Sequence, residues 1–398
     1  MKILITSGAW QASLACIQSL GRAGHEVYLI DQDPNLAVAH SKYCRGQILS
    51  PSEKDEAPYT NFLLDFVKKN HFDVLIPISD YCAQYCAKNQ AALKQYVRLL
   101  LPPAEVLAIA ANKTKTYAFA IEHKIAIPKT YFPSDLKEAQ ELSKEKIYPA
   151  MVKIPNSRAS KGVFRVNSQQ ELVDLFRANP FEGQWPVIQE YVEGEFFGFT
   201  AIACEGRILG HCTFKTHAQF LQGGTPPVIF SVVDPILLEQ AQNLIAKLHW
   251  TGAIDLDYFK VKNRGYVLLE INPRFSGSLN FAYRLGVDLP LMYYRLAMEG
   301  QKAGLKQHPY KNNVMFRTIF PTEIIRCHTN PQYKWTFLKN FFNLNSKSNI
   351  YWDDPRLTWW QMKETRWWCQ DIKRARVKTG LKSHLNTEPQ LLKAKESL

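Results

Sequence analysis

The first hundred residues alternate between short apolar runs and longer helical stretches, and this alternation restricts the possible folds more than any other feature. Apolar runs at 2–6, 26–31 and 73–78 are typical of strands, and the segments between them are typical of helices. Strands interleaved with helices favour a parallel, Rossmann-like sheet. The turn at 7–12 contains a single glycine and lacks the GxGxxG fingerprint, so we do not expect NAD binding.

The pattern changes after the first hundred residues, where strands accumulate with only a few helices between them. The last two of these strands, 252–261 and 265–272, are joined by a Lys-Asn-Arg-Gly turn. Mixed antiparallel strands with flanking helices indicate an α+β domain. We therefore expect an α/β Rossmann-like domain at 1–106, an α+β domain of two subdomains at 107–302, and a basic, Trp-rich C-terminal extension at 303–398.

The stretch LLEINPRFSGS at 268–278 carries the most specific chemistry. Glu270 and Asn272 lie two residues apart on an apolar strand, so both side chains face the same side. Such oxygen donors suit a hard divalent cation held against phosphates, and the Arg274 guanidinium that follows can grip a phosphate or a carboxylate. Asp257 lies on the preceding strand, where its carboxylate could meet that of Glu270, and two like charges this close favour a bound Mg²⁺. A core strand that ends in a polar turn remains the plain alternative.

Upstream residues supply further parts of a nucleotide site. Lys153 ends a buried apolar strand and Lys113 lies on a helix before it, and a buried ammonium needs a counter-charge such as a phosphate oxygen. The loop at 156–162 combines small residues with one arginine and one lysine. Its backbone N–H groups could therefore hold phosphates. Taken separately, each lysine is typical of the surface and the loop is typical of a solvent-exposed segment.

The order of these parts resembles that of the ATP-grasp superfamily of carboxylate–amine ligases. The matching parts are Lys113, PAMVK at 149–153, IQEYVEGE at 188–195, Asp257 and LLEINPR at 268–274. The chain is most similar to stand-alone ligases like the modules of the carbamoyl-phosphate synthase large subunit, and the resemblance covers about residues 1–300. It implies a Rossmann-like pre-ATP-grasp domain followed by an ATP-grasp domain, with ATP and Mg²⁺ as cofactors and Mn²⁺ as a substitute.

The resemblance also implies roles for single residues. Arg274 and Lys153 would be catalytic, neutralising the transferred phosphoryl group. Asp257, Glu270 and Asn272 would hold the metal ion; Asp257 stands where many relatives carry Glu or Gln. The nucleotide would be bound by Lys113, Lys153, Ser160, Lys161, Gly162, Glu190, Val192 and Glu195, with Glu190 and Val192 at the adenine through backbone groups and Glu195 at the ribose.

The implied reaction transfers the γ-phosphoryl group of ATP to a carboxylate, after which an amine attacks the acyl phosphate and an amide or peptide bond forms. Both substrates would be small molecules. One alternative is a non-catalytic nucleotide-binding or membrane-associated scaffold. A second is a biotin-type ATP-dependent carboxylase, which would need a biotin carrier that the sequence does not supply in recognisable form.

Substrate choice is predicted to lie in the irregular segment 213–230, which is also typical of an ordinary hairpin. Its candidate residues are Lys215, Gly223, Gly224 and Thr225. Asp80 follows a strand at the edge where open α/β sheets bind ligands. It could pair an incoming amine, but a helix N-cap is the preferred interpretation.

The C-terminal hundred residues carry most of the net charge of +13: residues 301–398 hold 18 Lys and Arg against 7 Asp and Glu, and six of the nine tryptophans. The basic, indole-rich stretch 351–378 could lie on a membrane, but we favour packing of its rings onto the protein body. No nucleic-acid motif accompanies the charge, so no nucleic-acid partner is expected. Scattered cysteines and the lack of a long apolar run favour a cytoplasmic protein, and a homodimer is compatible with the sequence.

Overall fold

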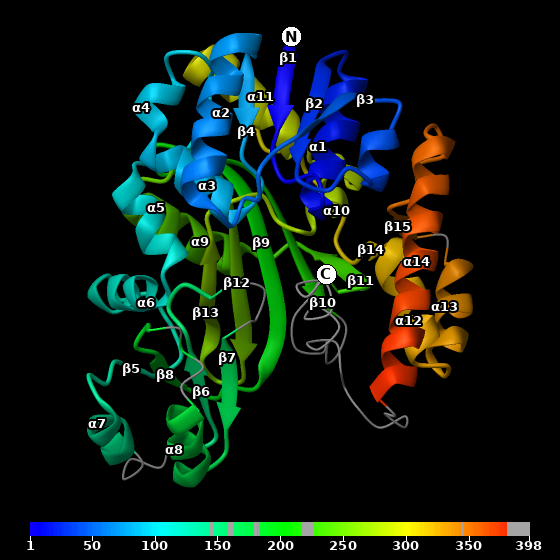
Figure 1. Ribbon diagram of the computed structural model, residues 1–398. Coiled ribbons are helices and arrows are strands. Elements are labelled where there is room, and N and C mark those ends of the chain that lie inside the picture. The colour runs from blue at the N-terminus through cyan, green and yellow to red at the C-terminus, as the bar shows by residue number, and fades with distance from the viewer. Residues whose placement is uncertain are drawn as a thin grey trace.

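The computed structural model describes residues 1–142, 147–157, 162–178, 181, 183–216, 226–343 and 345–379, and over 372–379 only the course of the helix. Three sheets organise this part of the chain (Figure 1). A parallel sheet begins it, and two further sheets built on antiparallel pairs follow. This succession agrees with the predicted α/β domain followed by an α+β domain.

The N-terminal sheet has the order β3-β2-β1-β4, with all pairs parallel. Apart from the exposed Lys2, the strands β1 and β4 consist of fully buried apolar residues, as expected for a sheet covered on both faces. The strand β3 was not predicted from the sequence because its residues, CRGQIL, do not form an apolar run. The elements of this unit are β1 (Lys2–Ile5), α1 (Gln11–Arg22), β2 (Glu26–Asp31), β3 (Cys44–Leu49), α2 (Glu56–Asn70), β4 (Val74–Ile76), α3 (Asp80–Lys88), α4 (Gln90–Leu93) and α5 (Ala104–Ala111).

A small antiparallel sheet of order β5-β8-β6-β7 follows, and the helices α7 and α8 flank it (Figure 1). Its buried side chains form a cluster of their own, which includes Val152, Leu172 and Ile188. The elements are α6 (Lys113–Glu122), β5 (Thr130–Tyr131), α7 (Leu136–Glu141), β6 (Ala150–Lys153), β7 (Val163–Val166), α8 (Gln169–Ala178) and β8 (Val187–Glu190).

The large sheet has the order β13-β12-β9-β10-β11-β14-β15. Its last two strands lie beyond residue 302, and β14 pairs with β11 and β15 with β14. The domain boundary predicted at 302 stays a prediction. The elements are β9 (Gly194–Cys204), β10 (Arg207–Thr216), β11 (Val228–Val232), α9 (Pro235–Lys247), β12 (Gly252–Val261), β13 (Gly265–Asn272), α10 (Leu279–Arg284), α11 (Leu289–Glu299), β14 (Met315–Arg317), α12 (Ile324–Thr329), α13 (Tyr333–Phe341), β15 (Ser346–Ser348) and α14 (Pro355–Thr379).

One hydrophobic cluster joins the N-terminal unit to the large sheet. It contains Ile5 and Leu14 from the parallel unit, Phe214 from β10 and Phe281 from α10. Leu357 of α14 belongs to the same cluster. The N-terminal unit, the large sheet and the start of the C-terminal helix are therefore packed around a common core, separate from that of the small sheet.

The C-terminal helix α14 docks on the N-terminal unit through a buried carboxylate. Asp354 is fully buried just before the helix begins, and its Oδ2 accepts hydrogen bonds from Ser41 Oγ at 2.5 Å and Gln18 Nε2 at 2.9 Å. Its neighbour Asp353 is exposed and forms an ion pair with Arg22 at 2.7 Å. The indole of Trp360 stacks on the His40 ring, with 3.7 Å between centroids.

We expect Asp354→Ala to lower the free energy of unfolding by roughly 3 kcal/mol, because two buried donors lose their acceptor. Asp353→Ala removes a solvent-screened pair and is expected to lower it by less than about 1 kcal/mol. Urea unfolding of both variants at pH 7 measures the difference. Equal effects of the two substitutions would contradict the docking role of the buried carboxylate.

Candidate active site

Two neighbouring strands of the large sheet gather oxygen-bearing side chains on one face. Asp257 of β12 is paired in register with Glu270 of β13, and Asp255 with Asn272. Residues 254, 256 and 271 alternate with these polar positions and belong to the core on the opposite face of the sheet. The polar side chains therefore lie together on the other face. Asn272 Nδ2 donates to Asp257 Oδ2 at 3.4 Å. The predicted meeting of Asp257 and Glu270 across neighbouring strands is confirmed.

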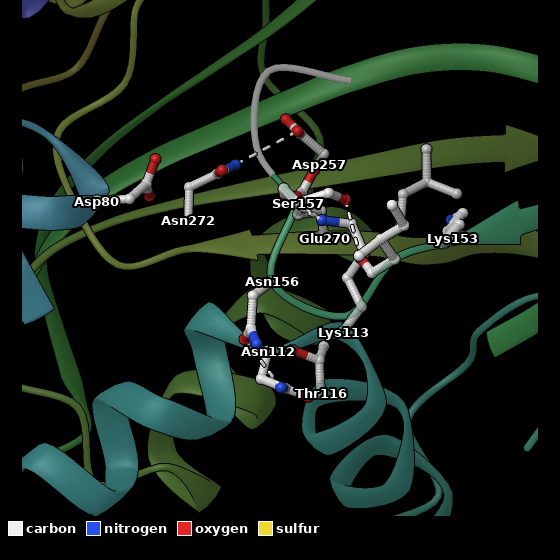
Figure 2. Close-up of polar contacts among 12 residues, drawn as sticks. Asp80, Asn112, Lys113, Thr116, Lys153, Asn156, Ser157, Asp257, Glu270 and Asn272 are labelled. Carbon is white, nitrogen blue, oxygen red and sulfur yellow. Dashed lines mark hydrogen bonds and ion pairs between the residues drawn. The ribbon is translucent and has the colours of Figure 1, made fainter. Parts of the chain in front are cut away.

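Lys113 lies at the start of α6 and points toward these strands. Figure 2 shows its side chain directed at Glu270, and Lys113 Nζ lies 2.7 Å from Glu270 Oε1 and 2.7 Å from the Ser157 carbonyl oxygen. The helix start is fixed by Asn112, whose Oδ1 caps the Lys115 N–H at 3.0 Å and whose Nδ2 donates to Asn156. The lysine is buried although it carries a charge. It therefore connects α6, the end of the β6 strand and the acidic pair.

Lys153, at the end of β6, is buried between two polar side chains. Its ammonium donates to the Tyr117 hydroxyl at 2.8 Å and to Gln189 Oε1 at 2.6 Å. Tyr117 in turn donates to the carbonyl oxygen of Leu269 in β13. Burial lowers the pKa of Lys153 to about 8; the carboxylate of Glu270 partly offsets this effect. At pH 7 this ammonium is still mostly charged, and an anion bound beside it would favour the charged form further.

Arg274 forms the other end of the site, where the large sheet meets the N-terminal unit. Its Nε lies 3.4 Å from the Asp80 carboxylate of α3, and its Nη1 lies 3.6 Å from Asp255 Oδ2. Its guanidinium also donates to Asn272 Oδ1 at 3.2 Å and lies 5.1 Å from the Trp10 ring centroid. Arg274 therefore crosslinks α3 to both strands that carry the acidic side chains.

The expected N-cap role of Asp80 is wrong. The cap of α3 is Ser79, whose hydroxyl accepts the Cys82 N–H at 3.1 Å, and Asp80 is the first helical residue. Its carboxylate is buried against Arg274. Whether Asp80 also contacts an amine substrate stays a prediction.

The carboxylates at this end of the site carry more negative charge than one arginine offsets. Burial raises the pKa of Asp255 to about 6 against the opposing pull of Arg274, and Oδ1 of Asp255 is buried without a hydrogen-bond partner. Burial together with the charges of Asp255 and Glu270 also raises the pKa of Asp257. A cation bound here would relieve both effects, so the residues fit a divalent metal ion.

The donor set fits magnesium in a particular way. In the described ranges, no three His, Cys, Asp or Glu side chains are placed to hold a metal ion by themselves. Two carboxylates and the Asn272 carboxamide are instead available from adjacent strands. Mg²⁺ commonly takes one or two carboxylates and completes its shell with water and substrate phosphates. Asp257, Glu270 and Asn272 would hold it in this manner together with ATP.

The remaining predicted residues lie around this centre or outside the described part of the chain. Glu190 at the end of β8 binds Arg264 with its carboxylate at 2.6 Å and lies two residues before the half-buried Val192. Glu195 and Lys215, predicted for ribose and substrate, form an ion pair with each other at 2.9 Å. Predicted residues outside the described ranges are Ser160, Lys161, Gly223, Gly224 and Thr225.

Gly162 closes the loop that was predicted to hold phosphates. Its φ of +75° favours glycine, and its carbonyl oxygen accepts the Ile154 N–H at 2.8 Å. A Cβ atom there would come within 2.8 Å of side-chain atoms of Ile154 and Ser157. The residue type is therefore set by the close approach of the loop to the end of β6.

Asp255, Trp10 and Tyr117 were not predicted from the sequence, and Gln189 was included only as part of the segment 188–195, without a role of its own. The signal for Asp255 was available, because it lies two residues before Asp257 on the same strand and so on the same face. Nothing local could indicate Tyr117 and Gln189, which meet Lys153 from α6 and β8. Trp10 meets Arg274 from a position 264 residues away in the chain.

Comparisons with known proteins bear on the part of the chain that carries this site. Residues 110–278 match the model of a family described as an ATP-grasp domain. No curated protein matches the chain.

Solved structures resemble the chain at low sequence identity. The biotin carboxylase domain dimer of Hydrogenobacter thermophilus 2-oxoglutarate carboxylase, in complex with MgADP, ADP and bicarbonate, is 14% identical, with a TM-score of 0.65 over 79% of this chain and 73% of that one. L-amino acid ligase from Bacillus licheniformis is 17% identical, with a TM-score of 0.60 over 75% of this chain and 74% of the ligase. N5-carboxyaminoimidazole synthetase from Staphylococcus aureus, complexed with ADP, is 14% identical, with a TM-score of 0.63 over 85% and 86%. These similarities confirm the predicted fold class, an N-terminal parallel α/β domain followed by antiparallel ATP-grasp sheets.

Proposed function

This chain is an ATP-grasp superfamily protein, as its motifs predicted, and on that premise we propose that it is an ATP-dependent ligase that joins a carboxylate to an amine through an acyl phosphate. The superfamily match supports an enzyme of the ATP-dependent ligase and carboxylase class. The observation that carries the finer proposal is the position of Arg274 at the end of the Asp257, Glu270 and Asn272 group. A phosphoryl group held there through a bound metal ion would lie beside the Arg274 guanidinium, whose fork of N–H donors suits a carboxylate or an acyl phosphate.

The proposed mechanism assigns charge neutralisation to the chain's own cations. Lys113 and Lys153 would bind the phosphates of ATP, and Arg274 would orient the substrate carboxylate for attack on the γ-phosphoryl group. Mg²⁺, when bound, would neutralise charge on the phosphate oxygens. The amine would then attack the acyl carbon and release inorganic phosphate. The acyl phosphate hydrolyses readily, so the site must exclude water while the amine reacts.

A biotin-type carboxylase shares the first step of this proposal. Bicarbonate is itself a carboxylate, and the fold alone fits biotin carboxylase and amino acid ligase alike. The two reactions differ in the acceptor of the activated carboxyl group. A test of function must therefore vary the carboxylate and the amine separately.

The experiment that tests the proposal is release of ADP and phosphate from ATP with Mg²⁺. Pooled small carboxylates and amino acids, bicarbonate alone, and carboxylates without any amine form separate arms, and Glu270→Gln is the control with strongly lowered turnover. Release that needs both a carboxylate and an amine, and that the substitution strongly lowers, would support the ligase. Release with bicarbonate alone would favour the carboxylase reaction. Binding of ATP with no release in any arm would favour a non-catalytic nucleotide-binding protein.

The lowered pKa of Lys153 predicts a pH dependence of ATP binding. The phosphates of ATP favour the charged ammonium, so binding raises the pKa of Lys153 above its free value of about 8. Above pH 8 the free protein has lost this proton and must regain it on binding, so affinity falls by up to about tenfold per pH unit. Titration with a non-hydrolysable ATP analogue between pH 6.5 and 9.5 measures this. Lys153→Met should bind more weakly at pH 7 and lose the dependence; an unchanged slope would assign it to another group.

A further inference from the structure

Large apolar side chains are exposed on the C-terminal helices far more densely than elsewhere. Half of the sixteen exposed large apolar residues in the described part of the chain fall between positions 335 and 367. Trp352 is 86% exposed, and Trp335 and Phe342 are each 78% exposed. Monomeric proteins rarely leave so much apolar surface in contact with water without a use for it. We call the following group the aromatic surface: Trp335, Phe341, Phe342, Trp352, Trp359 and Trp367.

The exposure is not a sign that α14 is poorly docked. The face of the helix that carries Leu357, Gln361 and Thr365, spaced four residues apart, is buried against the protein. Trp359 and Trp367 lie on the other side and are each about half exposed. The expectation that the tryptophans pack onto the body therefore holds for Trp360, which stacks on His40, and is wrong for these two. Figure 1 shows α13 and α14 along the outer side of the molecule, away from the small sheet.

The exposed charges on α13 and on α14 up to residue 371 are all of one sign, whereas the exposed Asp353 beside Trp352 is paired with Arg22. Exposed charged positions of α13 and of α14 up to residue 371 are Lys334, Lys339, Arg356, Lys363 and Arg366, without a single exposed Asp or Glu. Lys363 Nζ lies 4.2 Å from the Trp359 ring centroid, so the ammonium group and the indole are adjacent. These basic side chains favour an anionic partner for the surface.

We propose that the aromatic surface binds the face of an anionic lipid bilayer. Tryptophans beside lysine and arginine are the side chains that settle at the boundary between headgroups and acyl chains. The aliphatic Leu338 and Met362 extend the same exposed area and suit contact with acyl chains rather than with nucleobases. A second copy of the chain fits poorly, because face-to-face contact would oppose like charges. No helix in the described ranges has the length and apolarity to span a bilayer, so the contact is peripheral.

The test is flotation of the full-length protein with vesicles at 0.15 M NaCl, comparing phosphatidylcholine alone with a 70:30 mixture of phosphatidylcholine and phosphatidylglycerol. We expect flotation with the anionic vesicles only, and loss of most of it at 0.5 M NaCl. Each of the pairs Trp359→Ala/Trp367→Ala and Lys363→Glu/Arg366→Glu should lower the partition coefficient at least tenfold. The matched controls are Trp185→Ala, an exposed indole of the ATP-grasp body, and Lys68→Glu/Lys69→Glu on α2; both should float like the unmodified protein.

Thermal unfolding of every variant checks that the fold is retained, and the substituted residues of the aromatic surface are exposed, so little change is expected. Equal flotation of the surface variants and the controls would overturn the proposal. The absence of flotation with anionic vesicles would also overturn it. Binding of oligo-dT by a protein that does not float would assign the surface to nucleic acid instead. None of these readouts involves ATP, so the result is independent of the proposed ligase reaction.

Discussion

Arg274→Ala is expected to lose turnover by a factor of about 10³ or more and to destabilise the protein by about 3–5 kcal/mol at pH 7. Burial lowers the pKa of this arginine, but the carboxylates of Asp80 and Asp255 more than offset the effect and raise it, so the guanidinium keeps its charge in the site. Removal of the guanidinium leaves these carboxylates buried without their counter-ion. The same guanidinium is the group that would orient the carboxylate undergoing phosphorylation.

Two measurements separate these consequences. ADP release at saturating ATP reports turnover, and urea unfolding of the ligand-free protein reports stability. Arg274→Lys keeps a charge but loses the fork, so it should regain more stability than turnover. Arg177→Ala removes an exposed arginine paired with Asp174 at 3.7 Å and serves as the control, with an effect below about 1 kcal/mol. If Arg274→Ala were as stable as this control, the proposed electrostatic role of the cluster would be wrong.

Lys113→Met is expected to lower turnover by a factor of about 10² to 10³, because it removes a cation from the predicted phosphate site. The ion pair with Glu270 also positions the carboxylate that would hold the metal ion. The Glu270 side chain is a third exposed, so its loss of a partner is softened by solvent and stability should change little. The loss should therefore appear in turnover and in ATP affinity rather than in the unfolding curve.

A double-substitution cycle tests whether Lys113 and Glu270 act as one unit. Glu270→Gln alone should be at least as damaging as Lys113→Met, and the double variant should be little worse than the poorer single variant. Turnover of all four proteins, measured with the substrate pair found in the pooled assay, gives the coupling. Fully additive losses would mean that the 2.7 Å contact has no part in catalysis.

The sequence predicted those features that depend on local periodicity. The alternation of strands and helices located β1, β2 and β4, and the spacing of Glu270 and Asn272 placed both on one face of β13. The pairing of Asp257 with Glu270 followed from the short turn between their strands. In each case neighbours in the chain decided the geometry.

Features that depend on distant contacts were missed or assigned another role. Asp80 was predicted to be a helix cap because a polar residue after a strand commonly caps the next helix. Its environment is instead determined by Arg274, which lies 194 residues further along the chain. Glu195 and Lys215 were given separate ligand roles, and only the pairing of β9 with β10 shows that their side chains meet. The tryptophans of α14 were expected inside because indoles usually are. Which face of the helix docks depends on the surface of the N-terminal unit.

The separate hydrophobic cores imply that a relative shift of the parts would cost least between the small sheet and the rest. Residues from the parallel unit, the large sheet and α14 share one core, so relative rotation of these parts would expose apolar surface. The small sheet packs around its own cluster, which a shift against the large sheet would leave intact, whereas the 2.6 Å pair of Glu190 with Arg264 would have to break. Lys153 and Glu190 travel with that sheet, while Glu270 and Arg274 stay with the large one. Closure over a nucleotide would thus bring two groups of charges together by a hinge, and the helices that carry the aromatic surface would remain still.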